Sequence, residues 1–217
     1  MTSQLDPDRE CALCPRLVAY RAENRVQHPD WFNGAVPNFG TTTARLLIIG
    51  LAPGVSGANR TGRPFTGDYA GDLLYASLAK FGFSDGQYDR RADDGLTLQD
   101  CRITNAVRCV PPQNKPTPAE ITMCRPFLAD QLTAITAPTA LLCLGKISHD
   151  STIRALGGKL SQYPFAHGAR HHIDHITVFD SYHCSRYNTN TGRLTEAMFE
   201  EVFADIRAFI DDQSAGH

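Results

Sequence analysis

The sequence lacks the segments that would place a protein in a membrane or outside the cell. No run of residues approaches the roughly 18 apolar positions that a transmembrane helix needs. Residues 1–10 are polar and contain no apolar stretch of the kind found in secretory signal peptides. We therefore expect a soluble cytoplasmic protein without a membrane partner, and a monomer is the simplest expectation.

The chain also lacks a marked charge imbalance. It has 21 Lys and Arg against 23 Asp and Glu, a net charge of −2, so overall charge neither supports nor excludes a nucleic-acid partner. Of its 217 residues 42% are hydrophobic, which excludes a disordered or collagen-like chain. No repeat or linker interrupts it, and residues 1–217 are therefore predicted to form one domain.

Short apolar runs separated by helical patterns predict an α/β fold. The runs that read as strands are residues 45–50, 102–107, 140–145 and 173–179. The helical patterns cover residues 68–81, 117–132, 147–156 and 195–210. Strands that alternate with helices indicate a parallel sheet covered on both faces, a three-layer α/β/α sandwich.

Ligands of such sheets bind beyond the carboxyl ends of the strands. The unusual segments of this chain follow those ends, at residues 50–68, 108–118 and 181–193. Three loops would therefore converge on one crevice, which indicates an enzyme or a tight binder.

Cysteine spacing indicates a metal centre. Cys11 and Cys14 form a C-x2-C pair, and fourteen residues separate Cys109 from Cys124. Four thiolates complete a tetrahedral zinc site or hold an iron–sulfur cluster. The long second gap is atypical of a zinc ribbon, and unligated cysteines are the alternative. The histidines within residues 167–175 are not expected to bind a metal, because glycine and arginine interrupt the segment.

Each polar loop has a functional and a structural interpretation. The glycines of residues 50–68 allow close approach to a ligand, but no Gly-Lys-Ser/Thr ends a Walker loop. Asp68 suits a helix cap as well as catalysis, and Phe65 suits a core as well as a binding site. Asn114 can read a donor and an acceptor together or simply form a turn. Residues 182–193, with His183 at their start, suit contacts to a polyanion or a solvated loop.

Taken together, these motifs resemble the uracil-DNA glycosylase superfamily, specifically family 5. The matching segments occur in the family's order at residues 11–18, 50–68, 107–118 and 181–195. The resemblance implies a central four-stranded parallel sheet flanked by helices. It also implies a structural [4Fe–4S] cluster with the ligands Cys11, Cys14, Cys109 and Cys124.

The resemblance further implies an enzyme that flips uracil out of DNA and hydrolyses its N-glycosidic bond. Phe65 would stack on the base, Asn114 would pair with its Watson–Crick edge, and His183 would donate to O2 as charge develops. Asp68 would orient water or stabilise the sugar cation. Gly50, Leu51 and Ala52 would bind the substrate, with Leu51 replacing an acidic residue of family 4. The residues expected to bind DNA are Arg60, Arg63, Arg186, Asn188 and Arg193.

Two other classes of protein remain possible from the sequence. An iron–sulfur electron carrier would need the cysteines but not the polar loops, and a zinc-bound DNA-binding module would need no catalysis. Family 5 enzymes often accept other deaminated bases such as hypoxanthine. No lysine occupies a nucleophile position in the motifs, so cleavage of the DNA strand is not expected.

Overall fold

The computed structural model describes residues 5–134 and 139–215, so residues 1–4 of the polar N-terminal segment lie outside it. Within the described residues, one sheet has the strand order β1-β5-β2-β6-β8-β7, and β3 and β4 form a separate ribbon. The strands are β1 Phe39–Gly40, β2 Leu46–Gly50, β3 Ser84–Asp85, β4 Thr97–Leu98, β5 Cys101–Asn105, β6 Thr139–Leu144, β7 Arg170–Ile173 and β8 Ile176–Ser181.

The centre of the main sheet is parallel, as predicted. Strands β5, β2, β6 and β8 run in one direction, and β1 and β7 are antiparallel strands at its two edges. The prediction of one strand over residues 173–179 was wrong. Ile173 pairs with Ile176 across a two-residue turn in which Asp174 has a φ of 53°, a conformation that aspartate tolerates in tight turns.

The helices begin close to the predicted positions. They are α1 Pro15–Gln27, α2 Ala58–Thr61, α3 Tyr69–Lys80, α4 Pro118–Thr133, α5 Lys146–Ala155, α6 Arg186–Asn190 and α7 Glu196–Ala215, with a 3-10 turn at Pro112–Asn114. At α4 the predicted capping box is present: Thr117 accepts the Glu120 N–H, and Glu120 accepts the Thr117 N–H. None of the described helices is long and apolar enough to cross a lipid bilayer.

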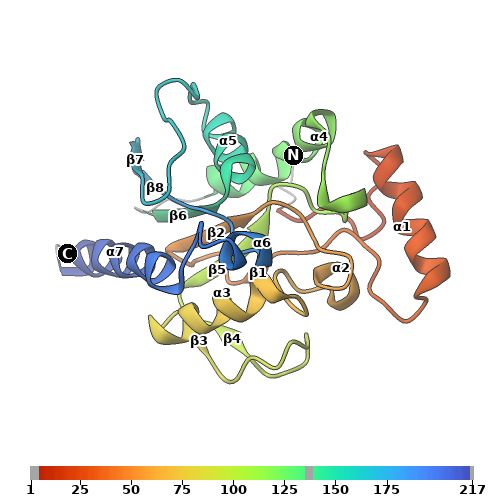
Figure 1. Ribbon diagram of the computed structural model, residues 1–217. Coiled ribbons are helices and arrows are strands. Elements are labelled where there is room, and N and C mark those ends of the chain that lie inside the picture. The colour runs from red at the N-terminus through yellow and green to blue at the C-terminus, as the bar shows by residue number, and fades with distance from the viewer. Residues whose placement is uncertain (1–4, 135–138, 216–217) are drawn as a thin grey trace.

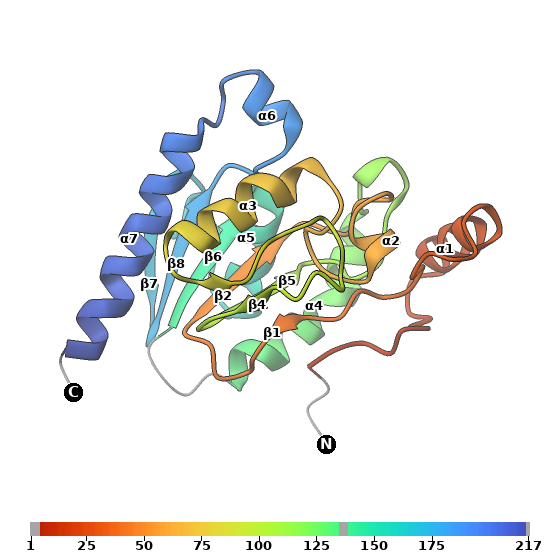
Figure 2. The same ribbon diagram turned by 90° about the horizontal axis from the view of Figure 1, so that it is seen from below.

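Helices cover both faces of the sheet (Figures 1 and 2). Side chains alternate along β2, so Leu46 and Ile48 pack in the core beneath α3 and α7, whereas Leu47 and Ile49 pack beneath α4 and α5. This arrangement confirms the three-layer α/β/α prediction. A third, smaller core joins Leu17 of α1 to Val107 and the four cysteines.

Candidate active site and cysteine centre

A crevice of about 560 Å³ opens at the carboxyl ends of the parallel strands. Leu51 and Ala52 follow β2, Gly145 follows β6, and His183 follows β8, and all four line the crevice. Asn114 enters from the 3-10 turn and Asp68 from the start of α3. The three loops predicted to converge therefore meet at one place, where α/β proteins bind their ligands.

A smaller pocket of about 30 Å³ continues the crevice inward. The residues common to both linings include Asp68 and His183, and the smaller pocket adds Phe65 and Asn105. Asn105 is only 4% exposed, and within the described part of the chain its side chain makes no hydrogen bond. Sequence reasoning missed it, although its position as the last residue of β5, at the carboxyl end of a parallel strand, was the available signal.

The backbone around Phe65 is held in an uncommon conformation. Phe65 is 7% exposed and has a φ of 52°, a left-handed value that costs energy for a residue with a side chain. Tyr88 stabilises this turn, because its hydroxyl donates to the Phe65 carbonyl and accepts the Gly67 N–H, both at 3.2 Å. A Cβ at Gly50 would lie 2.6 Å from the Phe65 ring and 2.3 Å from Asn105 Oδ1. Gly50 thus makes room for both side chains.

Asp68 is a helix cap and also lines the crevice. Its Oδ1 accepts the Gly71 N–H at 3.3 Å at the start of α3. Its Oδ2 lies against the glycine loop, only 2.3 Å from the position that a Cβ at Gly57 would occupy. Burial raises the pKa of the Asp68 carboxyl, although the backbone N–H groups of Gly71 and Ala70 oppose the shift.

His183 presents an unpartnered ring to both pockets. Within the described part of the chain no protein atom forms a hydrogen bond to its imidazole, while its backbone carbonyl accepts from Asn188 Nδ2 at 2.8 Å. Burial lowers the pKa of His183 to about 4, so the ring is neutral at neutral pH and has one N–H to donate. Asn188, predicted to bind DNA, thus also fixes the backbone that carries this histidine.

Asn114 lies at the rim rather than in the inner pocket. Its side chain is exposed, and both it and Gln113 have a φ of 56°. The two asparagines of the site, Asn105 and Asn114, therefore stand at different depths of the same crevice.

The predicted DNA-binding arginines differ in position. Arg186 and Arg193 line the crevice, are exposed, and lie over the rings of Tyr69 and Tyr182. Arg60 is exposed on α2 outside the crevice lining, where its Nε donates to the Ser56 carbonyl at 2.8 Å.

Arg63 does not fit the prediction. It is 5% exposed and forms two hydrogen bonds of 2.7 Å to the carboxylate of Asp94, 31 residues away in sequence. Rings of Phe39, Tyr75 and Tyr88 surround its guanidinium. This arginine is part of the core and is not available to a DNA phosphate.

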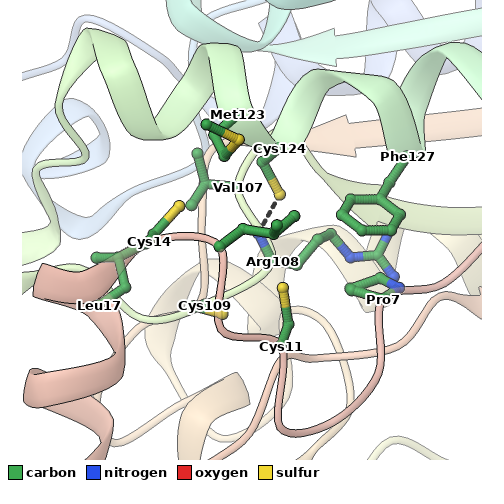
Figure 3. Close-up of a pocket in the computed structure, with 11 residues that line it drawn as sticks. Pro7, Cys11, Cys14, Leu17, Val107, Arg108, Cys109, Met123, Cys124 and Phe127 are labelled. Carbon is green, nitrogen blue, oxygen red and sulfur yellow. Dashed lines mark hydrogen bonds between the residues drawn. The ribbon is translucent and has the colours of Figure 1, made fainter.

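Four free cysteines from three segments surround one small cavity (Figure 3). Cys11 precedes α1 and Cys14 is its N-cap residue, Cys109 follows β5, and Cys124 lies on α4. Burial raises the pKa of Cys109 to about 11 and that of Cys124 to about 12. The remaining cysteines are buried elsewhere; they are Cys101, Cys143 and Cys184.

Another group of possible metal ligands is partly engaged in hydrogen bonds. Among the described residues, ligand atoms of His149, His171 and Asp180 lie within 4.8 Å of one another. Nδ1 of His149 is 2.8 Å from Asp180 Oδ1, and its Nε2 is 2.8 Å from the Tyr163 carbonyl. Both ring nitrogens of His149 are therefore engaged, whereas His171 Nε2 and Asp180 Oδ2, 3.3 Å apart, have no hydrogen-bond partner in the described part of the chain.

The polar groups gathered beyond the strand ends define an α/β enzyme with a deep ligand pocket. The family is identified by comparison with known proteins. The model of the Uracil DNA glycosylase superfamily matches residues 37–207, and the chain belongs to that superfamily.

Relatives cover nearly the whole chain. A type-5 uracil-DNA glycosylase of Thermus thermophilus is 42% identical over 91% of this chain and 92% of its own length. One from Pyrobaculum aerophilum is 38% identical over 88% of this chain and 85% of its own length. A type-4 uracil-DNA glycosylase of Sulfurisphaera tokodaii is 31% identical over 77% of this chain and 73% of its own length.

Proposed function

We propose that this protein is a DNA repair glycosylase that removes uracil from DNA by hydrolysing the N-glycosidic bond. Full-length similarity to type-5 uracil-DNA glycosylases supports the reaction. The observation that carries the proposal is the inner pocket, in which Phe65, Asn105, Asp68 and His183 line one space. A base inside a duplex cannot reach such a pocket, so the nucleotide must first be flipped out.

Recognition of the base is assigned to Phe65 and Asn105. The phenyl ring offers a stacking surface, and the amide of Asn105 can accept from uracil N3–H while donating to O4. Cytosine presents an unprotonated N3 and an amine at these positions, so the same amide orientation rejects it. Asn114, at the rim, contacts the flipped nucleotide closer to the mouth.

Bond cleavage is assigned to His183 and Asp68. The neutral imidazole donates its one N–H to uracil O2, where negative charge develops as the base departs. The Asp68 carboxylate orients the attacking water and stabilises the cationic sugar. Water takes the place of the base, so the products are free uracil and an abasic site. We expect no strand cleavage, because Lys146, the lysine in the crevice lining, is bound to both carboxylate oxygens of Asp150 at 2.8 Å.

Contact with the DNA backbone is assigned to the exposed arginines. Arg186 and Arg193 stand on the crevice wall, where phosphates flanking a flipped nucleotide would pass, and Arg60 extends this surface from α2. Asn188 supports the same loop. The net charge of −2 does not oppose this assignment, since a few local cations suffice.

The cysteine centre is assigned to a [4Fe–4S] cluster held by Cys11, Cys14, Cys109 and Cys124, with a structural role. The donor set consists of sulfur alone, which suits iron–sulfur clusters. The fourteen residues between Cys109 and Cys124, a gap that is atypical of a zinc ribbon, favour a cluster over zinc.

Four further assignments complete the proposal. Residues 1–217 act as one glycosylase domain, as a monomer in the cytosol. Other deaminated bases, hypoxanthine among them, are secondary substrates, because the inner pocket opens into a crevice that can accommodate a larger ring.

The test uses duplexes that carry one uracil, one hypoxanthine or one cytosine at the same position. The anaerobically purified protein should release uracil and leave an alkali-labile abasic site, with intact strands before alkali. Iron and sulfide should be present in equal amounts. An inactive wild-type protein that contains iron contradicts the proposed reaction, and stoichiometric zinc contradicts the proposed cofactor.

A further inference from the structure

A buried cation stands beside the cysteine centre without a carboxylate partner. Arg21 of α1 is 2% exposed, so its guanidinium lies in the protein interior. Its Nη1 donates to Cys109 Sγ at 3.3 Å, and its Nη2 donates to the Cys11 carbonyl at 3.0 Å. Its Nε has no hydrogen-bond partner. Both of its contacts are therefore to residues of the four-cysteine site.

Within the described part of the chain no carboxylate contacts Arg21, and the pKa of Glu10 is lowered chiefly by its hydrogen bond to Arg25 and only in part by the charge of Arg21. No ion pair joins it to a carboxylate there, whereas Arg63 is paired with Asp94 and Arg108 with Asp6. Glu10, on the neighbouring segment, is exposed and binds Arg25 at 2.7 Å instead. An arginine in the interior costs free energy unless an anion compensates its charge. The atoms that Arg21 touches identify that anion as the sulfur centre.

We propose that Arg21 is the charge-compensating residue of the cysteine centre: its guanidinium stabilises the net negative charge of the four thiolates and their cluster through Cys109. The inference rests on the iron–sulfur cluster proposed above. Reduction makes the cluster more negative, so a cation that donates to a ligand sulfur stabilises the reduced state more than the oxidised one. Arg21 therefore sets the reduction potential of the cluster, besides helping to retain it.

Arg21→Gln removes the charge and keeps a hydrogen-bond donor, on a side chain two bonds shorter. The matched control is Arg25→Gln, one turn further along α1, where the guanidinium binds Glu10 and the Asn33 carbonyl rather than sulfur. The wild type and both variants are purified anaerobically. Their iron and sulfide contents are measured, and the reduction potential is determined by voltammetry.

In Arg21→Gln the reduction potential of the cluster should become more negative by about 59 mV, which corresponds to about a tenfold change in the one-electron equilibrium constant. The cluster should also be lost to an iron chelator several-fold faster, and Arg25→Gln should match the wild type. Arg21→Lys keeps the charge and should lie between the wild type and Arg21→Gln. If Arg21→Gln cannot hold the cluster, Arg21→Lys decides: a cluster kept by the retained charge supports the inference, and a cluster lost as fully as in Arg21→Gln contradicts it.

Two results would overturn the inference while leaving the cofactor intact. One is a loaded Arg21→Gln protein with the wild-type potential, which would reduce Arg21 to a packing residue. The other is an equal shift in Arg25→Gln, which would attribute the effect to long-range charge. A wild-type protein without iron contradicts the cofactor itself, and the inference with it.

Discussion

The ring of Phe65 lies 6.0 Å from the ring of His183, centroid to centroid, with 28° between their planes. Phe65 reaches this position from a strained turn after the glycine loop, and His183 reaches it from the end of β8. The two residues belong to segments more than a hundred positions apart. Both rings line the inner pocket.

Substitutions at Asp68 are expected to separate its catalytic role from its role as a helix cap. Asp68→Asn keeps an oxygen that can accept the Gly71 N–H, so the melting temperature should stay close to that of the wild type. The single-turnover rate should fall by about 10²–10⁴, because the carboxylate charge is lost. Asp68→Ala should lose both the rate and about 1 kcal/mol of unfolding free energy. A fully active Asp68→Asn protein would leave Asp68 as a cap alone.

The His183 ring is expected to act as a neutral donor. His183→Gln should lower the single-turnover rate by about 10²–10³, with much less effect on affinity for uracil-containing DNA. In the wild type the rate should fall at acid pH as Asp68, whose pKa burial raises, takes up a proton. That acid limb should persist in His183→Gln and disappear in Asp68→Asn. Measured pH–rate profiles of the three proteins test the assignment.

Acid should destabilise the fold through the same histidine. The pKa of His183 is about 4 in the folded protein and about 6.5 when unfolded, so the unfolded chain binds the extra proton between these values. The unfolding free energy therefore decreases as the pH falls from about 6.5 toward about 4. Denaturant titrations at several pH values give the unfolding free energy as a function of pH. This free energy should depend less steeply on pH in His183→Gln than in the wild type. An identical slope would show that the ring is solvated in the folded state.

Asn105 and Asn114 are expected to contribute differently to selectivity. Asn105→Asp replaces an amide with a group that cannot donate to uracil O4, so the preference for uracil over cytosine should drop at least about tenfold. Asn114→Asp, the matched change at the exposed rim, should affect the cleavage rate more than the choice of base. Competition between uracil and cytosine duplexes measures both. If selectivity is lost in Asn114→Asp and kept in Asn105→Asp, the base is recognised by Asn114 at the rim.

Binding to DNA is expected to depend on salt through the crevice arginines. Arg186→Ala and Arg193→Ala should each reduce the slope of log K against log salt by about one unit, because each removes one phosphate contact. Arg207→Ala is the control, since this arginine lies over Phe83 and binds Asp211 on α7. Unchanged slopes in both crevice variants would place the DNA on another face.

Local sequence patterns predicted the parts of the molecule that depend on neighbouring residues. The capping box at Thr117 and the cap at Asp68 are set within a few positions, and the structure has both. The β7–β8 turn was missed because Asp174 and His175 are short interruptions in an apolar run. Arg63 was assigned wrongly because its partner, Asp94, is brought to it only by folding.

In the candidate site, too, contacts that form only on folding could not be predicted from the sequence. Asn105 ends a strand whose sequence resembles any buried strand, and only the fold reveals that its side chain shares a pocket with Phe65 and His183. The prolines that flank Asn114 made it a candidate in the sequence, but a local pattern does not show how deep in a pocket a side chain lies. The order of the motifs was enough to identify the family. The roles of individual site residues could be assigned only once their positions in the fold were known.

The spacing of three residues along one stretch of chain makes the reaction pocket dependent on the cysteine centre. Cys109 comes four residues after Asn105 and five before Asn114, so both asparagines are carried by a segment whose middle is fastened to α1. Ala52, which lines the pocket, packs against the same small core. With the cluster proposed above, loss of the metal group is therefore expected to displace Asn105 and Asn114, and so to abolish base recognition, before the sheet itself unfolds.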